Sequence, residues 1–349
     1  MTQKREKYVN IPFLIYSNSL KRFVLILSLL SLQSCQRNQA LPNALEKYHE
    51  RIYRVLELEP KQIAIKSTLT FPDKNSLLIT IPDLNINMRE FYAIEGCGIK
   101  QLVAERNTAL GKTQLPSMRL KYEWQLIQRL QSCIENTSTS SNEILRAKMQ
   151  DWLEQKSKHY PLNWSNMITQ SKEFHIALSK SSGFIDGNED DNFTQSLFDL
   201  RNLIGMKEQP ELNLAEMETS LQSVQSHRLY ARLWRSQSLV QKYLEQMTVD
   251  ISNWQVGFTC NTRKDKEKLK IIRNVFTLYF AQEVQAIGSQ INHYHYLLKP
   301  EFEKLSNDRH LPSPIKAVIA KYNQAEFTEY QKTVIEHVKM WQVIFKKCD

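Results

Sequence analysis

Glycine and proline are scarce in this chain, which has 8 glycines and 11 prolines in 349 residues. An all-β fold that turns every few residues needs more of both, so the composition argues against a sandwich or barrel of many short strands. The hydrophobic share of 42% and the aromatic share of 10% are those of a chain that buries a large core. We therefore expect a globular protein built from long helices.

Signatures of several common enzyme classes are missing as well. The sequence contains no Gly-x-Ser-x-Gly, no His-Glu-x-x-His, no phosphate-binding loop and no dinucleotide fingerprint. It also lacks Cys-x-x-Cys, so neither a redox motif nor a zinc knuckle is indicated. No metal and no cofactor are therefore expected. Carboxylates and histidines are the residues left to test for catalysis.

Basic residues do not gather into a surface suited to nucleic acid. The formal net charge is +9, but five basic residues against one acidic residue give residues 1–35 alone a net charge of +4. The densest basic run, 263–268, alternates with acidic residues and is typical of a solvated helix start. No nucleic-acid partner is expected.

A short hydrophobic run near the start indicates a secretion signal. Lys21 and Arg22 precede apolar or small residues at 23–32, and the stretch ends in Leu32-Gln33-Ser34-Cys35. Ten helical residues span about 15 Å, half of a bilayer core, so this run is too short to cross a membrane. The Leu-x-Ser-Cys ending resembles the lipobox of bacterial lipoproteins, in which the leader is removed and the cysteine is acylated.

The lipobox resemblance implies a domain plan and a location. Residues 1–34 would be the signal peptide, 35–42 the lipidated Cys35 with a tether, and 43–349 a single helical domain. Several acyl chains on one residue give stable membrane anchoring. Gln36 in place of aspartate implies the outer membrane of a Gram-negative envelope, with the domain on the periplasmic face. The alternative is an ordinary secretory leader followed by a chance cysteine.

Four cysteines remain when Cys35 carries lipid, and an even number in an oxidising periplasm predicts two disulfides. Of the three connectivities we favour the two that join neighbours in chain order, Cys97 with Cys133 and Cys260 with Cys348. In the loop-entropy model these closures contribute about 4 and about 4.5 kcal/mol to stability.

Apolar residues recur at steps of three or four over long stretches, which predicts amphipathic helices. The clearest stripes run over 214–251, 269–298 and 327–345. Stripes of this length need partner helices to bury them, so the predicted fold class is all-α, a multi-helix array or bundle. Pro161 is expected to open a helix and Pro300 to stop one. The period changes at 61–83, where we predict either a short β-hairpin or an extended arm.

The stretch from Cys97 to Cys133 predicts a helical hairpin closed by a disulfide. Glu105 and Glu123 are its candidate catalytic residues, because two carboxylates about 5 to 10 Å apart can cleave a glycan. Arg119 precedes Glu123 by four residues, a helical spacing that favours a salt bridge, and arginine-paired carboxylates are poor general acids. We therefore favour a polar structural knot over a catalytic site. The candidate binding residues are Arg106, Asn107, Lys112, Ser117, Arg119 and Tyr122.

Two groups of histidines are interpreted as structural. His293 and His295 would point to opposite sides of a helix, so they do not form a metal pair there. His337 stands one helical turn before Trp341, and we interpret it as a hydrogen-bonded histidine at the boundary of the core.

Motifs between Cys97 and Cys133 indicate a family. Ala104-Glu105-Arg106-Asn107-Thr108-x-Leu110-Gly111-Lys112 is followed by Pro116-Ser117-x-Arg119-Leu120-x-Tyr122-Glu123. These motifs resemble the domain-of-unknown-function 3080 family, lipoproteins of Gram-negative bacteria. Tyr48-x-x-Arg51-Ile52 and His337-Val338-x-x-Trp341-Gln342 fit the same family, so the resemblance covers nearly the whole mature chain. The resemblance implies a location and a residue list, and it implies no reaction.

Together these observations predict a non-enzymatic envelope factor. It would bind or scaffold an envelope protein or peptidoglycan through the stapled hairpin, while its lipid holds it at the membrane. The alternative is a glycan-acting cell-wall enzyme that uses Glu105 and Glu123. The oligomeric state stays open.

Overall fold

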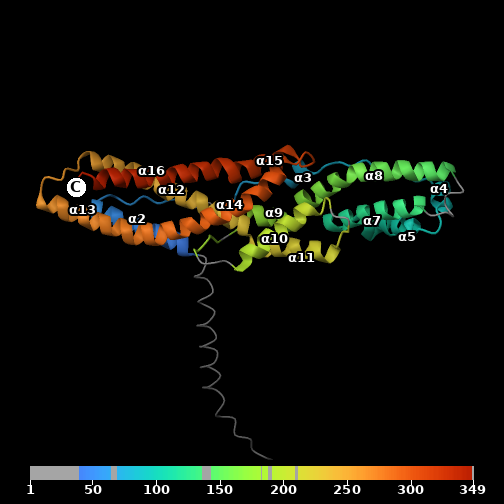
Figure 1. Cartoon of the computed structure of the whole chain (residues 1–349), viewed down its shortest axis with the longest axis horizontal. Coiled ribbons are helices and arrows are strands. Elements are labelled where there is room, and N and C mark those ends of the chain that lie inside the picture. The colour runs from blue at the N-terminus through green and yellow to red at the C-terminus, as the bar shows by residue number, and fades with distance from the viewer. Residues whose placement is uncertain are drawn as a thin grey trace, which may run out of the picture.

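Long helices packed lengthwise make up nearly all of the described chain, as the computed structural model shows (Figure 1). The structure describes residues 39–63, 69–135, 143–181, 183–187, 191–208 and 211–347. Within these ranges there is no β-strand, so the all-α prediction is confirmed. None of the described helices is long and apolar enough to cross a bilayer.

The described helices are named in chain order. The first part of the chain forms α2 (Ala40–Leu56), α3 (Lys74–Leu77), α4 (Met88–Ala93), α5 (Ile99–Asn107), α6 (Ala109–Lys112) and α7 (Pro116–Glu135). The middle forms α8 (Glu143–Gln170), α9 (Lys172–Ser179), α10 (Asp191–Gly205), α11 (Leu214–His227) and α12 (Leu229–Val256). The last part forms α13 (Arg263–Val275), the π-helix η2 (Phe276–Val284), α14 (Gln285–Asn307), α15 (Ser313–Ala320), the π-helix η3 (Lys321–Ala325) and α16 (Glu326–Phe345).

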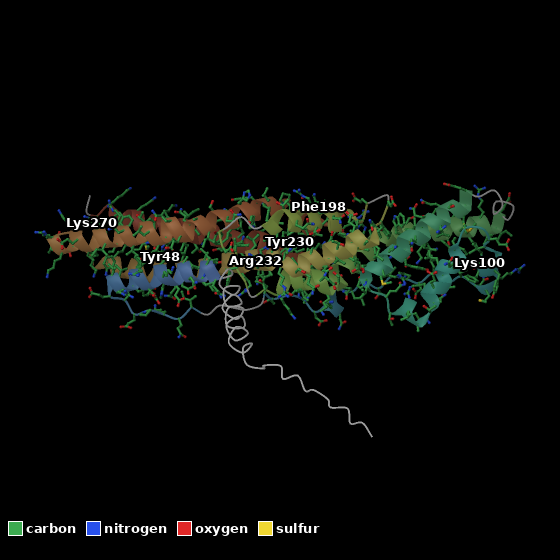
Figure 2. All side chains as sticks on the ribbon, turned by 90° about the horizontal axis from the view of Figure 1, so that it is seen from below. Tyr48, Lys100, Phe198, Tyr230, Arg232 and Lys270 are labelled. Atoms are coloured by element: carbon green, nitrogen blue, oxygen red, sulfur yellow. A yellow bond between two sulfur atoms is a disulfide. The ribbon has the colours of Figure 1, made fainter. Side chains whose placement is uncertain are left out.

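Two groups of helices give the molecule its elongated shape (Figure 1). The main bundle consists of α2, α12, α16 and the rod formed by α13, η2 and α14. The stapled lobe consists of α4 to α7 with the first half of α8. Lys270 and Lys100 mark the opposite ends of the molecule (Figure 2). The first half of α8 lies along α7, and its second half contacts α9 and α10, which in turn pack against α12 and α14 of the main bundle.

Large aromatic side chains fill the main bundle. α12 packs along α16, and α2 packs against η2. The largest side chains sealed between these helices are Tyr48, Trp234, Phe280, Phe302 and Trp341. The apolar stripe over 269–298 faces this core, as its periodicity predicts. The first described helix begins at Ala40, and Leu41 in its first turn is fully buried.

Two prolines lie inside helices, where the sequence predicted helix ends. Pro161 is within α8 and Pro300 is within α14. Each proline removes one backbone hydrogen bond. Buried aromatic residues on both sides of each proline hold the helix in line: Tyr160 and Trp164 in α8, and Tyr294 and Phe302 in α14. The expectation that these prolines bound their helices was therefore wrong.

The described part of 61–83 forms an extended arm on α8, and no β-hairpin. The arm is interrupted by one turn of helix, α3, which is capped by Asp73. Asn166 of α8 bonds both backbone groups of Ile79, donating to its carbonyl and accepting from its N–H at 2.9 Å each. Gln170 likewise donates to the Lys74 carbonyl at 3.0 Å. Because side chains of α8 satisfy these backbone groups, the arm needs no second strand. Residues 64–68 lie outside the described residues.

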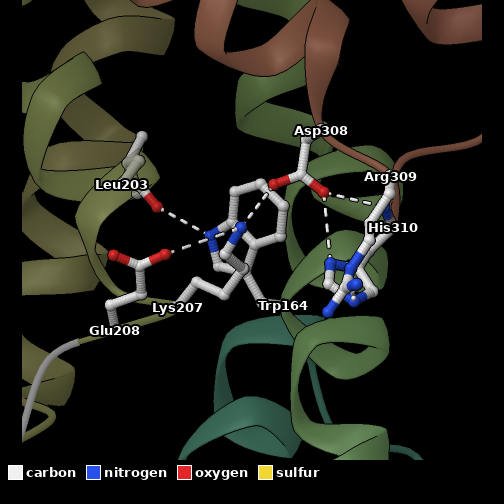
Figure 3. A network of polar contacts seen from close by, with 7 residues as sticks. All are labelled: Trp164, Leu203, Lys207, Glu208, Asp308, Arg309 and His310. Carbon is white, nitrogen blue, oxygen red and sulfur yellow. Dashed lines mark hydrogen bonds and ion pairs between the residues drawn. The ribbon is translucent and has the colours of Figure 1, made fainter.

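Lys207, just after α10, ties α8 to the end of α14 (Figure 3). Its ammonium pairs with Asp308 and lies 5.1 Å from the ring centroid of Trp164 on α8. The Trp164 indole N–H donates to the Leu203 carbonyl at 2.9 Å. Asp308 also accepts from the backbone N–H of His310 at 2.8 Å. This cluster fixes the second half of α8 against the main bundle and so sets where the stapled lobe projects.

The predicted disulfide closes the stapled lobe. Cys97 and Cys133 are bonded, with their Cα atoms 5.4 Å apart, and both side chains are buried. The bond joins the residue before α5 to the end of α7, across the open ends of the hairpin, as the sequence predicts. Cys260 is disulfide-bonded as well, and Cys348, the partner that we favour for it, lies outside the described residues.

Candidate functional site

A pocket of about 640 Å³ opens in the stapled lobe. The segment before α4, the hairpin of α5 and α7, and the first half of α8 surround it. Its polar lining residues are Asp83, Asn85, Arg106, Asn107, Lys112, Arg119, Tyr122 and Lys156. Its apolar lining residues are Leu84, Ile86, Met88, Phe91, Ile99, Val103, Ala104, Leu126, Leu130 and Trp152. This volume lies within the range of small-molecule sites, about 300 to 1,000 Å³.

A tight turn between α5 and α6 places two of the cations. The Thr108 hydroxyl donates to the Glu105 carbonyl at 2.8 Å and accepts from the Gly111 N–H at 3.0 Å, which caps α6. Arg106 donates through Nη1 to the Gly111 carbonyl. A Cβ on Gly111 would lie 2.3 Å from the Glu105 carbonyl oxygen, so only glycine allows α6 to approach this closely. Lys112 directly follows this close contact.

Glu123 is the buried centre of a charge cluster behind the pocket. Only 1% of its side chain is exposed. Arg119 Nη2 lies 2.5 Å from Oε1, and Lys156 Nζ lies 2.9 Å from Oε2. Neither contact meets the geometry of a hydrogen bond, so both are ion pairs only. One carboxylate thus holds two pocket cations in place, from α7 and from α8.

Arg106 and Tyr122 complete the polar wall. Burial, followed by the positive charge of Arg119, lowers the pKa of Arg106 from its ordinary value. Burial, followed by the negative charge of Glu123, raises the pKa of Tyr122 to about 12, so its phenol stays protonated at neutral pH. The Arg119 guanidinium carbon lies 5.4 Å from the Tyr122 ring centroid, a cation–π distance. The wall therefore presents donors and positive charge.

The charges of the pocket do not cancel. Among the described residues four cations line it, from Arg106, Lys112, Arg119 and Lys156, and Asp83 is the one acidic residue of that described lining. Even with the buried carboxylate behind them counted, the site keeps a net charge of about +2. Such a site attracts anions, because positive charge in a partly desolvated cavity acts at a low effective dielectric constant.

A family model describes this chain over residues 45–349, under the description "Protein of unknown function (DUF3080)". The chain belongs to this family. No curated protein and no solved structure is detectably similar to it. The motifs that carry the family resemblance, 104–112 and 116–123, supply five polar residues of the pocket wall in this DUF3080 protein.

The structure separates the two candidate catalytic carboxylates. Glu105 is exposed, accepts from Gln101 at 3.0 Å and does not line the pocket. Glu123 is sealed behind Arg119 and Lys156. The structure contains the Arg119–Glu123 salt bridge that the helical spacing predicts, and Glu105 takes no part in it.

Five of the six candidate binding residues line the pocket: Arg106, Asn107, Lys112, Arg119 and Tyr122. Ser117 faces elsewhere, because its hydroxyl donates to Glu218 on α11 and ties the hairpin to the rest of the fold. Cys35, the predicted lipidation site, lies outside the described residues. No group of acidic, histidine or cysteine residues suited to a metal ion occurs in the part of the chain that the structure describes.

Sequence reasoning missed Lys156. Its side chain is 7% exposed, although lysine is seldom buried without a partner. A signal was present, since Lys156 interrupts the apolar stripe of α8 formed by Met149, Trp152 and Tyr160. A lysine on the buried face of a helix predicts a buried acid on the neighbouring helix, which here is Glu123.

A second buried polar cluster, in the main bundle, surrounds His337. The Thr248 hydroxyl donates to the Leu244 carbonyl at 2.6 Å and lies 2.9 Å from His337 Nδ1, so Nδ1 carries the proton. His337 Nε2 then accepts from the Tyr48 hydroxyl at 2.8 Å, and Trp341 Nε1 donates to the same hydroxyl oxygen at 2.8 Å.

Both ring nitrogens of His337 thus have partners, so its hydrogen-bonded role is confirmed. The predicted boundary position is wrong, because His337 is 0% exposed. His293 is exposed and His295 is buried, on opposite sides of α14 as predicted. His295 stacks on Phe327, with ring centroids 3.3 Å apart.

Proposed function

We propose that this DUF3080 protein is a non-enzymatic binding factor of the bacterial envelope. Acyl chains on Cys35 would hold it at the outer membrane with its helical domain on the periplasmic side. The stapled lobe would bind an envelope protein or peptidoglycan, and the cationic pocket would receive an anionic group of that partner. The observation that carries the proposal is the excess of positive charge around a pocket of about 640 Å³.

The state of the carboxylates supports binding over glycan cleavage. A glycosidase needs two carboxyl groups that face the same sugar from either side. In this lobe both oxygens of Glu123 are engaged by cations, and Glu105 points to solvent outside the pocket. The donors that remain accessible to a ligand are positively charged groups and the Tyr122 phenol, which suit recognition of an acid.

Exposed apolar side chains on the hairpin also suit contact with a macromolecule. Leu110 and Leu115 between α5 and α7 are 84% and 58% exposed, Met118 at the start of α7 is 41% exposed, and Met88, which lines the pocket, is 65% exposed. Exposed apolar side chains on one part of a surface are a feature of interaction sites.

Crosslinking in living cells tests this proposal. A photoreactive phenylalanine derivative is placed at Leu110 on the lobe or at Val256 at the far end of α12, because both side chains are 84% exposed. We expect a discrete protein or muropeptide adduct from position 110 and none from position 256. Lys156→Gln should weaken the adduct, because it removes a pocket cation. Equal adducts from both positions, or none from either, would contradict the proposal.

The anchor has its own test. Cys35→Ser should move the protein from the membrane fraction to the soluble periplasmic fraction, and intact wild-type protein should carry acyl mass on the peptide that begins at Cys35. A wild-type protein without acyl mass would remove the membrane part of the proposal and leave the binding part standing.

A further inference from the structure

The pocket is half apolar, and this half is not explained by binding of an acid alone. Val103, Phe91 and Trp152 line it from three elements, and Ile99, Leu126 and Leu130 form its floor. These floor residues belong to the core that also packs around the disulfide, so their positions are fixed. A hydrated anion such as phosphate would contact the cations and leave this wall facing water.

One polar group in the same pocket is buried without a hydrogen bond, since Arg106 Nε has no partner among the described residues. Lys156 lines the pocket as well, and its partner there is Glu123, in an ion pair without hydrogen-bond alignment. A buried donor left unsatisfied in a native fold calls for an explanation, and a bound acceptor supplies one. The acceptor has to reach the cations while its remainder lies on the apolar floor.

We infer that the ligand of this pocket is an anionic amphiphile, an acid group joined to an unbranched apolar chain of roughly eight to ten carbons, a size suited to cavities of this class. The acid, either a carboxylate or a phosphate monoester, lies between Lys156, Arg106 and Arg119, and the chain covers Val103, Phe91 and Trp152. The inference rests on the proposed function for the use of this pocket as a binding site, and it adds the chemical class of the ligand.

Charge and chain length have separable effects on affinity. Each methylene moved from water into an apolar site strengthens binding by about fourfold. Shortening the chain by three carbons should therefore weaken binding by about 60-fold if the chain lies on the apolar floor. Reversing the sign of the head group should weaken it at least tenfold, because the site carries excess positive charge.

Calorimetric titration of the full chain with Cys35→Ser tests the inference, since this protein carries no acyl chains and needs no detergent. The ligands are decanoate, decyl phosphate, heptanoate, decylamine and inorganic phosphate. We expect decanoate or decyl phosphate to bind. If the carboxylate is preferred, heptanoate should bind about 60-fold more weakly than decanoate. Decylamine should bind at least tenfold more weakly than either ten-carbon acid. Preference between the two ten-carbon acids identifies the acid group.

Two variants each remove one pocket cation. Lys156→Met should weaken binding of the ten-carbon acids at least tenfold, and its melting temperature is measured alongside, because it leaves buried Glu123 with one cation in place of two. Lys112→Met at the exposed rim leaves that buried cluster intact, so it should weaken binding by a smaller factor with the melting temperature unchanged. Phe91→Ser should reduce the dependence on chain length and keep the preference for acids.

Inorganic phosphate that binds as tightly as decyl phosphate would overturn the amphiphile, and decylamine that binds as tightly as decanoate would overturn the acid. If none of the ligands binds while position 110 still crosslinks a partner in cells, the amphiphile is refuted and the proposed function survives. If decanoate binds but position 110 crosslinks no partner in cells, the amphiphile survives and the proposed function is refuted.

Discussion

Replacing His337 with glutamine should change how the stability of the main bundle depends on pH. Burial lowers the pKa of His337 from 6.5 to about 3. The His337 ring therefore takes up a proton near pH 6.5 in the unfolded chain, and only near pH 3 in the folded chain. The contribution of this histidine to stability is complete above pH 6.5 and falls as the pH drops from there towards 3.

The size of the effect follows from these two values. At pH 5.0 the solution lies about 1.5 pH units below 6.5, and each unit corresponds to about 1.36 kcal/mol. The parent protein should thus lose about 2 kcal/mol of unfolding free energy between pH 7.5 and pH 5.0 through His337 alone. Glutamine can accept from the Tyr48 hydroxyl and donate to Thr248, so His337→Gln should fold, with a cost of about 1 to 3 kcal/mol at pH 7.5.

Urea unfolding followed by circular dichroism measures both proteins at the two pH values. The difference in free energy of unfolding between parent and variant should decrease by about 2 kcal/mol on going to pH 5.0, because the variant lacks the histidine that is protonated in the unfolded parent chain. His295, whose pKa burial lowers to about 4, is present in both proteins and cancels in the comparison. His293→Gln is measured in parallel as a second histidine replacement, at an exposed position outside the His337 cluster. A gap between parent and His337→Gln that is the same at both pH values would refute the reasoning.

Three further predictions concern the stapled lobe, each measured by thermal or urea unfolding. Gly111→Ala should destabilise the lobe by about 1 to 3 kcal/mol, because its Cβ would meet the Glu105 carbonyl oxygen at 2.3 Å; a neutral result would show that α6 can move away. Replacing both cysteines of the Cys97–Cys133 disulfide with serine should cost about 4 kcal/mol, and a parent protein that is equally stable under reducing conditions would contradict this. Glu123→Gln should lower the free energy of unfolding by about 3 to 5 kcal/mol, because Arg119 and Lys156 would stay in place without the carboxylate that neutralises them. Glu105→Gln, at an exposed position, should change it by less than about 0.5 kcal/mol. Equal effects of the two glutamates would refute the buried cluster.

Local patterns were enough to predict the disulfide-closed hairpin of the stapled lobe. Its two cysteines are neighbours in chain order, and in the structure they are bonded across its open ends. The Arg119–Glu123 pair follows from helical spacing alone, and the structure has it. Each of these features depends on residues that are close together in the chain.

Predictions failed where a distant segment supplied the deciding energy. Pro161 and Pro300 were expected to bound helices, but burial of aromatic residues on both sides of each proline keeps the helices continuous. The arm near Ile79 was predicted as half of a hairpin or as an extended segment, and Asn166 of α8 decides for the extended form. Sequence periodicity contains no information about which helix lies beside such a segment.

The sequence by itself therefore determined the all-α class, the helical stripes and the disulfide-closed hairpin, because these depend on spacings of a few residues and on the pairing of cysteines that are neighbours in chain order. Tertiary structure alone decided that Lys156 would meet Glu123, that Ser117 would turn away to Glu218, and that an apolar floor would lie beneath four cations. The physical reason is that the pocket is made of side chains from several different helices, and the packing of these helices against a shared core fixes which of those side chains meet.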